Sequence, residues 1–455
     1  MYYALLGLVA AICTFAILRD WRRWRDVFHP TIYCVPQLMF LYVALPLYGL
    51  ATDEFEFVSR AGYWDELADF QFIAAVMCMA LIFGIRWGAR TVGGPPISIG
   101  EQDARAIFAV AILFGILGFV AWIVGIINVG GFDAAYGRAY GGGWDDSGYV
   151  REAAQFGLIA APLLVLSRRK GGMRLQHWIL VFIALLPLLV QGILGARRGP
   201  TFLAITGLAA SYVLTFRPRI PFWLAFTAAL LVGSLLLWLV ANRDAIYLGS
   251  EKALDSPASR MLENWSGNEY LFSSAIVRYV NETGEAFYGM RVFAHMAARV
   301  VPSAIWPTKY ADVLAAVGLD IDLTQDAGIP VDRIATVTGC KVAVGAAPGM
   351  VGDFWMEFGM FAPLAVFAMG ALYGKLWRAS RADARLQPAY AIFAALSIYF
   401  LTQTIEAWTF RALLFGIPAV VALRILAHRR SHARVANPVW YAHSLTQRRG
   451  ARHCE

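Results

Sequence analysis

The feature that most constrains the fold of this chain is the repetition of long apolar runs. A helix needs about 20 apolar residues to cross about 30 Å of hydrocarbon, and runs of roughly this length recur along the sequence. Because they are continuous rather than alternating, they exclude a transmembrane β-barrel. The sequence therefore predicts an all-α integral membrane protein with about eleven transmembrane helices, near residues 2–18, 31–50, 68–85, 105–127, 152–167, 177–194, 200–216, 221–241, 351–374, 388–404 and 409–426.

Composition supports this class. The chain is 59% hydrophobic and only 15% charged, whereas a soluble domain is nearer half apolar and a quarter charged. The net charge of +8 lies mostly in short connections and the tail, where a topology signal belongs, so no nucleic-acid partner is expected. The five cysteines show neither CxxC nor Cys/His spacing, which predicts neither a metal site nor a disulfide framework.

Basic residues follow every second apolar run, and the connections between them are poor in Lys and Arg. Positive residues favour the cytoplasmic side, so we expect the N-terminus outside and the C-terminus in the cytoplasm. The first run has no basic residue before it, which indicates a first span rather than a cleaved signal peptide. The basic groups are Arg19, Arg22, Arg23 and Arg25; Arg86 and Arg90; Arg168, Arg169, Lys170 and Arg174; Arg217 and Arg219; and Lys375, Arg378, Arg381 and Arg385.

One long interval, residues 242–350, contains no apolar run. About a hundred residues are too many for a simple connection, so we expect a small folded extracytoplasmic cap with helices near 261–281 and 287–301. The cap separates an N-terminal bundle of about eight spans, residues 1–241, from a C-terminal bundle of about three, residues 351–427. Residues 428–455 form a basic cytoplasmic tail.

Within the predicted cap, Arg291, His295 and Arg299 follow each other at intervals of four residues. On a helix they share one face. Guanidinium groups match the geometry of phosphate oxygens, and an imidazole accepts a proton near neutral pH. This row is therefore a candidate site for a phosphate-rich ligand. The alternative is the solvated face of an amphipathic cap helix.

A second cationic candidate lies at Arg197 and Arg198, which end one span on the extracytoplasmic side. Only Gly199 and Pro200 separate them from the next apolar run, so a tight turn holds both guanidiniums at the depth of lipid phosphates. Ionisable residues near membrane depth are candidates for function. The alternative is a pair that anchors the turn by reaching to the interface.

Carboxylates near the predicted outer boundary are the candidate bases. Asp353 and Glu357 lie four residues apart at the start of the ninth span. We expect them either to orient an acceptor hydroxyl or act as a base, or to pair with Arg197, Arg198 or Arg411.

Glu269 lies on an expected cap helix, with Arg278 nearby in sequence, and is a further candidate base. Glu406 and Arg411 form the turn between the last two spans, where we expect them to pair. A cation site is not expected, because four loop aspartates lack the spacing of an EF-hand; they are Asp320, Asp322, Asp326 and Asp332.

Three segments together resemble a known family. They are GARRGP (195–200), VPSAIWPTK (301–309) and PGMVGDFWMEFGMFAPLAVFAMGALYG (348–374). Over about residues 190–425 the chain resembles the oligosaccharide repeat-unit polymerases of bacterial envelope assembly, of the O-antigen polymerase type. The resemblance implies a fold like the C-type membrane glycosyltransferases (GT-C), located in the bacterial inner membrane with a periplasmic N-terminus.

The resemblance also implies a function. Such enzymes move a growing glycan from one undecaprenyl-diphosphate carrier onto a sugar hydroxyl of another, without a cofactor or metal. Their partners are the lipid-linked oligosaccharide, membrane lipids, and as candidates a chain-length regulator and a flippase. Two alternatives stay open: an O-antigen ligase, and a polytopic transporter, although neither internal repeats nor paired broken spans occur.

Carried onto this sequence, the resemblance assigns two roles. Arginines hold the donor diphosphate, and a histidine or carboxylate serves as the base. The diphosphate would be held by Arg197 and Arg198, and its binding site would be completed by Arg278, Arg291 or Arg299. The base would be His295, Glu269 or Asp353.

Overall fold

The computed structural model describes residues 1–51, 63–90, 99–139, 148–195, 197–257, 269–301, 305–321, 328–339 and 347–423. The described part is 81% helical and contains no strand. Eleven helical stretches within it are long and apolar enough to cross a membrane. The predicted class and number of spans are thus confirmed: this is a multi-pass, all-α membrane protein.

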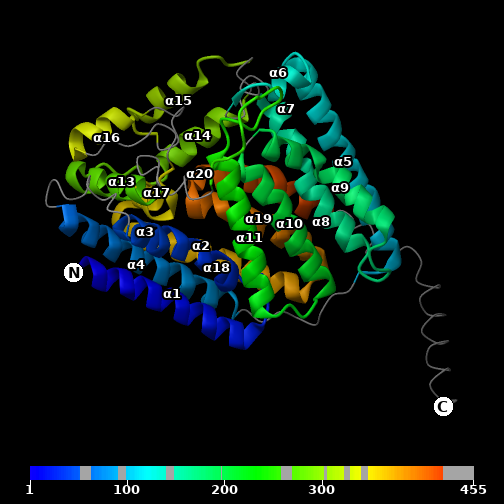
Figure 1. Cartoon of the computed structure of the whole chain (residues 1–455), viewed down its shortest axis with the longest axis horizontal. Coiled ribbons are helices and arrows are strands. Elements are labelled where there is room, and N and C mark those ends of the chain that lie inside the picture. Colours follow the sequence, from blue (N-terminus) through cyan, green and yellow to red (C-terminus); the bar gives the residue numbers. More distant parts are fainter. Residues whose placement is uncertain are drawn as a thin grey trace.

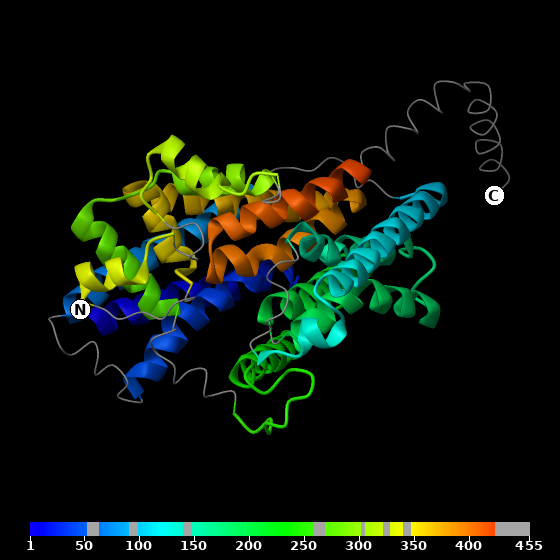
Figure 2. The ribbon, with the colours of Figure 1, turned by 90° about the horizontal axis from the view of Figure 1, so that it is seen from above.

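The helices form one elongated bundle with short helices over one end (Figures 1 and 2). Some of the eleven stretches consist of one helix and others of shorter helices in succession. Their helices are α1 (Tyr2–Trp24), α2 (Pro30–Met39) continuing into α3 (Leu45–Ala51), α4 (Tyr63–Gly88), α5 (Glu101–Asn128), α7 (Gly148–Ala153) leading into α8 (Gly157–Ser167), α9 (Leu175–Ile193), α10 (Arg198–Phe216), α11 (Phe222–Ala241), α17 (Gly349–Phe358), α18 (Ala362–Ala382), α19 (Gln387–Thr402) and α20 (Ile405–Arg411). The short ones are α6 (Phe132–Tyr136), α13 (Glu269–Thr283), α14 (Met290–Val300), α15 (Lys309–Val317) and α16 (Val331–Thr338).

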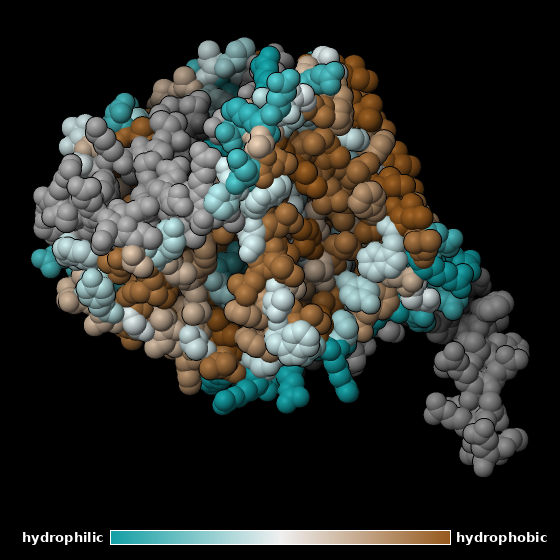
Figure 3. Space-filling view, viewed as in Figure 1, coloured by the Kyte–Doolittle hydropathy of each residue, from teal (hydrophilic) through white to brown (hydrophobic). Residues whose placement is uncertain are grey.

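Burial divides the long helices into inner and outer ones. Almost every side chain of α19 is buried, whereas α11 buries only the three residues at its C-terminal end. The outer faces of α5, α9 and α11 expose large apolar side chains, which gather on the right of the face shown in Figure 3. Apolar surface of this extent on a bundle fits contact with lipid.

Glycines allow α4 and α18 to pack closely. A Cβ at Gly84 would lie 2.1 Å from the carbonyl oxygen of Phe367, and one at Gly370 would lie 2.4 Å from that of Leu81. Small residues are typical of membrane helix interfaces because they allow backbones to approach.

The two ends of the bundle differ in charge. At one end, the hydroxyls of Tyr2 and Tyr270 share a hydrogen bond of 2.8 Å, so α1 begins beside α13. With 23 residues at about 1.5 Å each, α1 ends about 34 Å away. There Arg86 pairs with Asp20 at 3.2 Å, and the basic C-terminal ends of α10 and α18 meet through the hydrogen bond that Arg217 donates to the Arg381 carbonyl. The basic connections after these spans therefore share one end, as the sequence predicts.

The interval 242–350 contains the four short helices α13 to α16, which lie together at the upper left of Figure 1. Helices α13 and α14 correspond to the two predicted cap helices, although residues 261–268 lie outside the described residues. Helix α13 packs against α17, and α14 packs against α15 and α20. The predicted tail, 428–455, also lies outside the described part.

The predicted ninth span is divided in two. Gly359 has φ of 52°, a conformation that side-chain-bearing residues rarely adopt, and it ends α17. Helix α18 then crosses the bundle with 21 residues, about 31 Å. The break allows α17 to lie beside the cap while α18 packs against α4.

Candidate functional site

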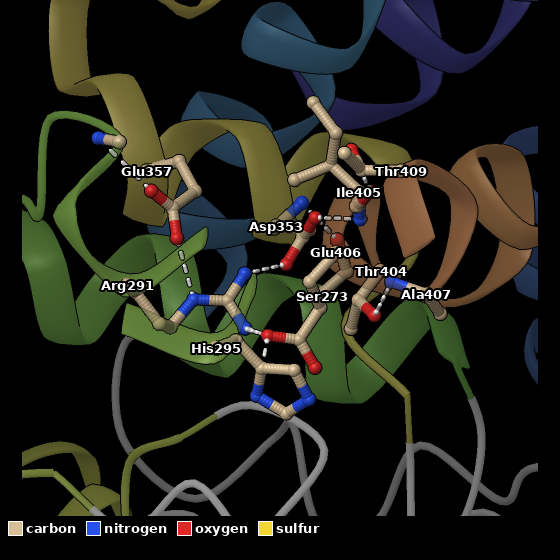
Figure 4. Close-up of polar contacts among 12 residues, drawn as sticks. Ser273, Arg291, His295, Asp353, Glu357, Thr404, Ile405, Glu406, Ala407 and Thr409 are labelled. Carbon is tan, nitrogen blue, oxygen red and sulfur yellow. Dashed lines mark hydrogen bonds and ion pairs between the residues drawn. The ribbon is translucent and has the colours of Figure 1, made fainter. Parts of the chain in front are cut away.

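Arg291, in the first turn of α14, is the centre of a buried ionic cluster (Figure 4). Its side chain is 0% exposed. It donates through Nη2 to Asp353 Oδ1 at 2.5 Å, through Nε to Glu357 Oε1 at 2.6 Å and through Nη1 to Glu406 Oε2 at 3.2 Å. One guanidinium thus joins α14 to α17 and α20.

Two of the three carboxylates are fully engaged. Asp353 and Glu357 share a face of α17 because they are four residues apart. Asp353 Oδ2 accepts the backbone N–H of Ile405 at 2.6 Å, and Glu357 Oε2 accepts that of Gly289 at 3.0 Å. Every carboxylate oxygen of this pair therefore has a donor, so these residues fix the positions of helices.

The charge balance of the cluster is negative. Three carboxylates around one guanidinium leave a formal excess of two negative charges. Although burial opposes it, the carboxylates raise the pKa of Arg291 above its ordinary value. Because the side chain is 0% exposed, a diphosphate does not reach it. Arg291 is thus placed to position carboxylates rather than to line an open phosphate cradle.

His295 lies one turn further along α14 and is 3% exposed. Its Nδ1 is 3.4 Å from Glu406 Oε2, and neither ring nitrogen makes a hydrogen bond within the described part of the chain. Burial, with help from Arg299 and Arg291, lowers the pKa of His295 to about 3. The imidazole is therefore neutral near pH 7 and keeps one nitrogen lone pair.

The turn at Arg197 and Arg198 differs in its surroundings. Arg198 begins α10 and forms an ion pair with Glu269, at the start of α13, while its side chain remains 35% exposed. Gly199 packs on α19, since a Cβ there would lie 3.2 Å from Tyr399 Oη. The turn thus lies at the same end of the bundle as the cap.

Helix α20 connects this turn with α14. The Arg411 guanidinium lies 4.2 Å from the centre of the Tyr399 ring, the ring against which Gly199 packs. The Arg299 guanidinium lies 5.0 Å from the centre of the Phe410 ring, next to Arg411. The Arg299 end of α14 thus contacts α20 directly, whereas the Arg197–Arg198 turn is linked to α20 through Tyr399 of α19.

Other predicted residues are placed differently. Arg278 pairs with Glu66 at 2.8 Å and with Glu282 at 2.7 Å. The predicted pairing of Glu406 with Arg411 is wrong. Five residues along a helix turn by about 500°, or about 140° apart, so Glu406 faces Arg291 and Arg411 faces Glu152 at 3.8 Å.

The sequence interpretation missed Glu152 and Tyr399, and it did not assign Glu406 to Arg291. A signal existed for the two acids, because an ionisable residue at the end of a span is a candidate for function. Tyr399 carried none, since aromatic residues are frequent in such helices. Among the described residues, no group of three or more His, Cys, Asp or Glu side chains is arranged to hold a metal ion.

The site thus combines partly exposed cations at a helix turn with a buried, neutral imidazole beside a carboxylate. The first group is suited to meeting an anion. The second offers a nitrogen lone pair, although the lowered pKa of the imidazole opposes its protonation. Comparison of the chain with known protein families, with curated proteins and with solved structures finds no match. Function is therefore argued from this geometry and from the resemblance of sequence motifs.

Proposed function

We propose that the protein is a membrane glycosyltransferase that joins undecaprenyl-diphosphate-linked repeat units into a cell-surface polysaccharide at the periplasmic face of the bacterial inner membrane. The observation that carries the proposal is that Tyr399 lies between the Arg197–Arg198 turn and Arg411 of α20, while Arg299 of α14 contacts the preceding residue, Phe410, beneath a helical cap. The motif resemblance around residues 195–200 and 348–374 supports the same reaction.

The reaction needs both kinds of group. The acceptor hydroxyl attacks the anomeric carbon, the bond from that carbon to the diphosphate oxygen breaks, and the lipid diphosphate leaves with the electron pair. The developing negative charge requires fixed cations, and one such donor lowers the activation barrier by about 3 kcal/mol. Arg197 and Arg198 take this role, with Arg299 and Arg411 close by.

The proton of the acceptor hydroxyl goes to His295. A neutral imidazole has the required lone pair, but its lowered pKa makes it a weak base, so the transfer depends on Glu406, 3.4 Å from its Nδ1, to stabilise the charge that the ring acquires. Asp353 and Glu357 fix the positions of α14, α17 and α20 relative to one another around this base.

The cap has a separate role. Helices α13 and α14 lie over the end of the bundle and exclude water, which otherwise hydrolyses an activated glycosyl donor. The donor arrives through the bilayer, so cations that bind it belong at headgroup depth. Arg198, at the end of a predicted span and 35% exposed, meets this requirement.

The test is chain extension by purified full-length protein with lipid-linked repeat units. Arg198→Ala should remove most of the product ladder while the protein stays monodisperse. The matched control is Arg278→Ala, which also removes an ion-paired arginine near α13 but lies with Glu66 and Glu282. It should retain activity. An unchanged ladder from Arg198→Ala would overturn the proposal, and transfer only to lipid A core would indicate the ligase instead.

A further inference from the structure

A second basic site lies at the end of the bundle opposite the cap. A recess of about 30 Å³ opens between the C-terminal ends of α1 and α4, next to the start of α2. This is room for roughly two water-sized groups, enough for oxygens of one small anion and too little for a sugar. Polar side chains line it: Arg19, Asp20, Arg23, His29, Arg86 and Arg90.

The recess has a strong positive excess. Four guanidiniums line it against one carboxylate, Asp20, which pairs with Arg86 at 3.2 Å. Three formal positive charges therefore remain. Arg86 Nη2 is buried and makes no hydrogen bond to any described residue, whereas Arg19, Arg23 and Arg90 are exposed. The exposed three lie at the rim of the recess, and Arg23 rests over the Trp24 ring at 4.8 Å from its centre.

His29 gives the recess a fixed polar wall. The ring is 0% exposed, stacks on Trp24 with ring centres 5.8 Å apart and meets Trp377 edge-on at 4.5 Å. Both of its nitrogens lack a hydrogen bond in the described part of the chain. Leaving a buried donor unsatisfied costs about 1–3 kcal/mol, so an acceptor placed in the recess would remove this cost.

The protonation state of His29 supports a donor role. Burial, opposed by Asp20 and reinforced by Arg86 and Arg23, lowers the pKa of His29 to about 4. Near pH 7 the ring is therefore neutral and carries one N–H. The arginines provide the charge, and the histidine provides a directed hydrogen bond.

We propose that this recess binds a phosphate group, presented either by an anionic lipid headgroup in the adjacent leaflet or by a soluble phosphate. Arginine forks match phosphate oxygens in geometry and charge. Lipid headgroups reach this end of the bundle, and basic side chains flanking spans attract them. The recess lies about the length of α1 from the Arg291 cluster, so it is independent of the proposed reaction.

The test measures binding by full-length protein in phosphatidylcholine nanodiscs with and without phosphatidic acid, read by native mass spectrometry. Arg19→Gln combined with Arg23→Gln should weaken lipid retention about tenfold, the loss of about 1.4 kcal/mol. The matched control is Arg22→Gln combined with Arg25→Gln. These two arginines are exposed at the same end of α1 but do not line the recess, and the change in net charge is equal.

Inorganic phosphate, titrated without anionic lipid, distinguishes the two sources. If phosphate displaces phosphatidic acid, and if only the Arg19/Arg23 variant loses binding, the site is open to soluble anions. Retention of phosphatidic acid unaffected by phosphate supports a headgroup site. Equal loss in both double variants would show that surface charge alone attracts lipid, and would overturn the proposal, as would no loss in either.

Discussion

The two arginine sites, around Arg291 and around Arg198, differ in burial and in the number of carboxylates they contact. Arg291 is 0% exposed and contacts three carboxylates, whereas the Arg198 side chain is 35% exposed and, among the described residues, pairs with one carboxylate, Glu269. In a buried guanidinium surrounded by carboxylates, each nitrogen already donates to a carboxylate oxygen, so the guanidinium serves to position those carboxylates. A partly exposed guanidinium with one partner can still meet an anion. The same residue type thus has two roles, set by its surroundings.

The largest expected difference is in stability. Arg291→Ala leaves three buried carboxylates without their cation, and removing one partner of a buried ion pair costs about 3–5 kcal/mol. Arg198→Ala should cost less than about 1 kcal/mol, because its pair is partly exposed. The measurement is the loss of the monodisperse peak on heating detergent-solubilised protein. Similar shifts for both variants would remove the distinction drawn between the sites.

Lysine substitutions sharpen the comparison in activity. A lysine at 198 keeps a point charge that still serves a phosphate, so Arg198→Lys should recover part of the roughly 100-fold loss expected for Arg198→Ala. Arg291→Lys should recover little, because one ammonium cannot replace a fork that faces three carboxylates. Rates of chain extension at saturating substrate check this. Equal rescue at both positions would contradict the assigned roles.

The buried site should also make stability depend on pH. Because the pKa of His295 is lowered to about 3, from about 6.5 in the unfolded chain, the unfolded state binds more protons between these values. The contribution of His295 to stability is therefore full above pH 6.5 and is lost as pH decreases toward 3, by at most about 1.4 kcal/mol per pH unit, while protonation of the buried carboxylates that face it acts in the opposite direction. His295→Gln should flatten this slope in thermal unfolding measured from pH 7 to 4.5. Arg278→Gln, away from the cluster, should leave the slope unchanged.

The smallest expected effect tests how the exposed turn contacts the bundle. A Cβ at Gly199 would lie 3.2 Å from Tyr399 Oη, so Gly199→Ala should cost about 1 kcal/mol through overpacking. Removing the hydroxyl with Tyr399→Phe should recover most of that loss in the double variant. Additive losses in unfolding temperature would mean that the turn does not press on this ring.

Local patterns predicted much of this protein. The eleven spans followed from the length of apolar runs, and the gathering of basic connections at one end followed from their recurrence after every second span. The four-residue spacing of Arg291, His295 and Arg299 correctly predicted a helix. It did not predict burial, because both an exposed and a buried face satisfy the same spacing.

By itself the sequence determined the membrane class, the number of spans and the positions of the charged residues, because these depend on properties of contiguous segments. Only the tertiary structure decided which charges meet. Arg291 contacts acids that are 62, 66 and 115 positions away, and Glu406 faces it rather than Arg411. Such choices depend on which helices become neighbours and how each is rotated, and a guanidinium's role changes with the number of carboxylates that this packing places around it.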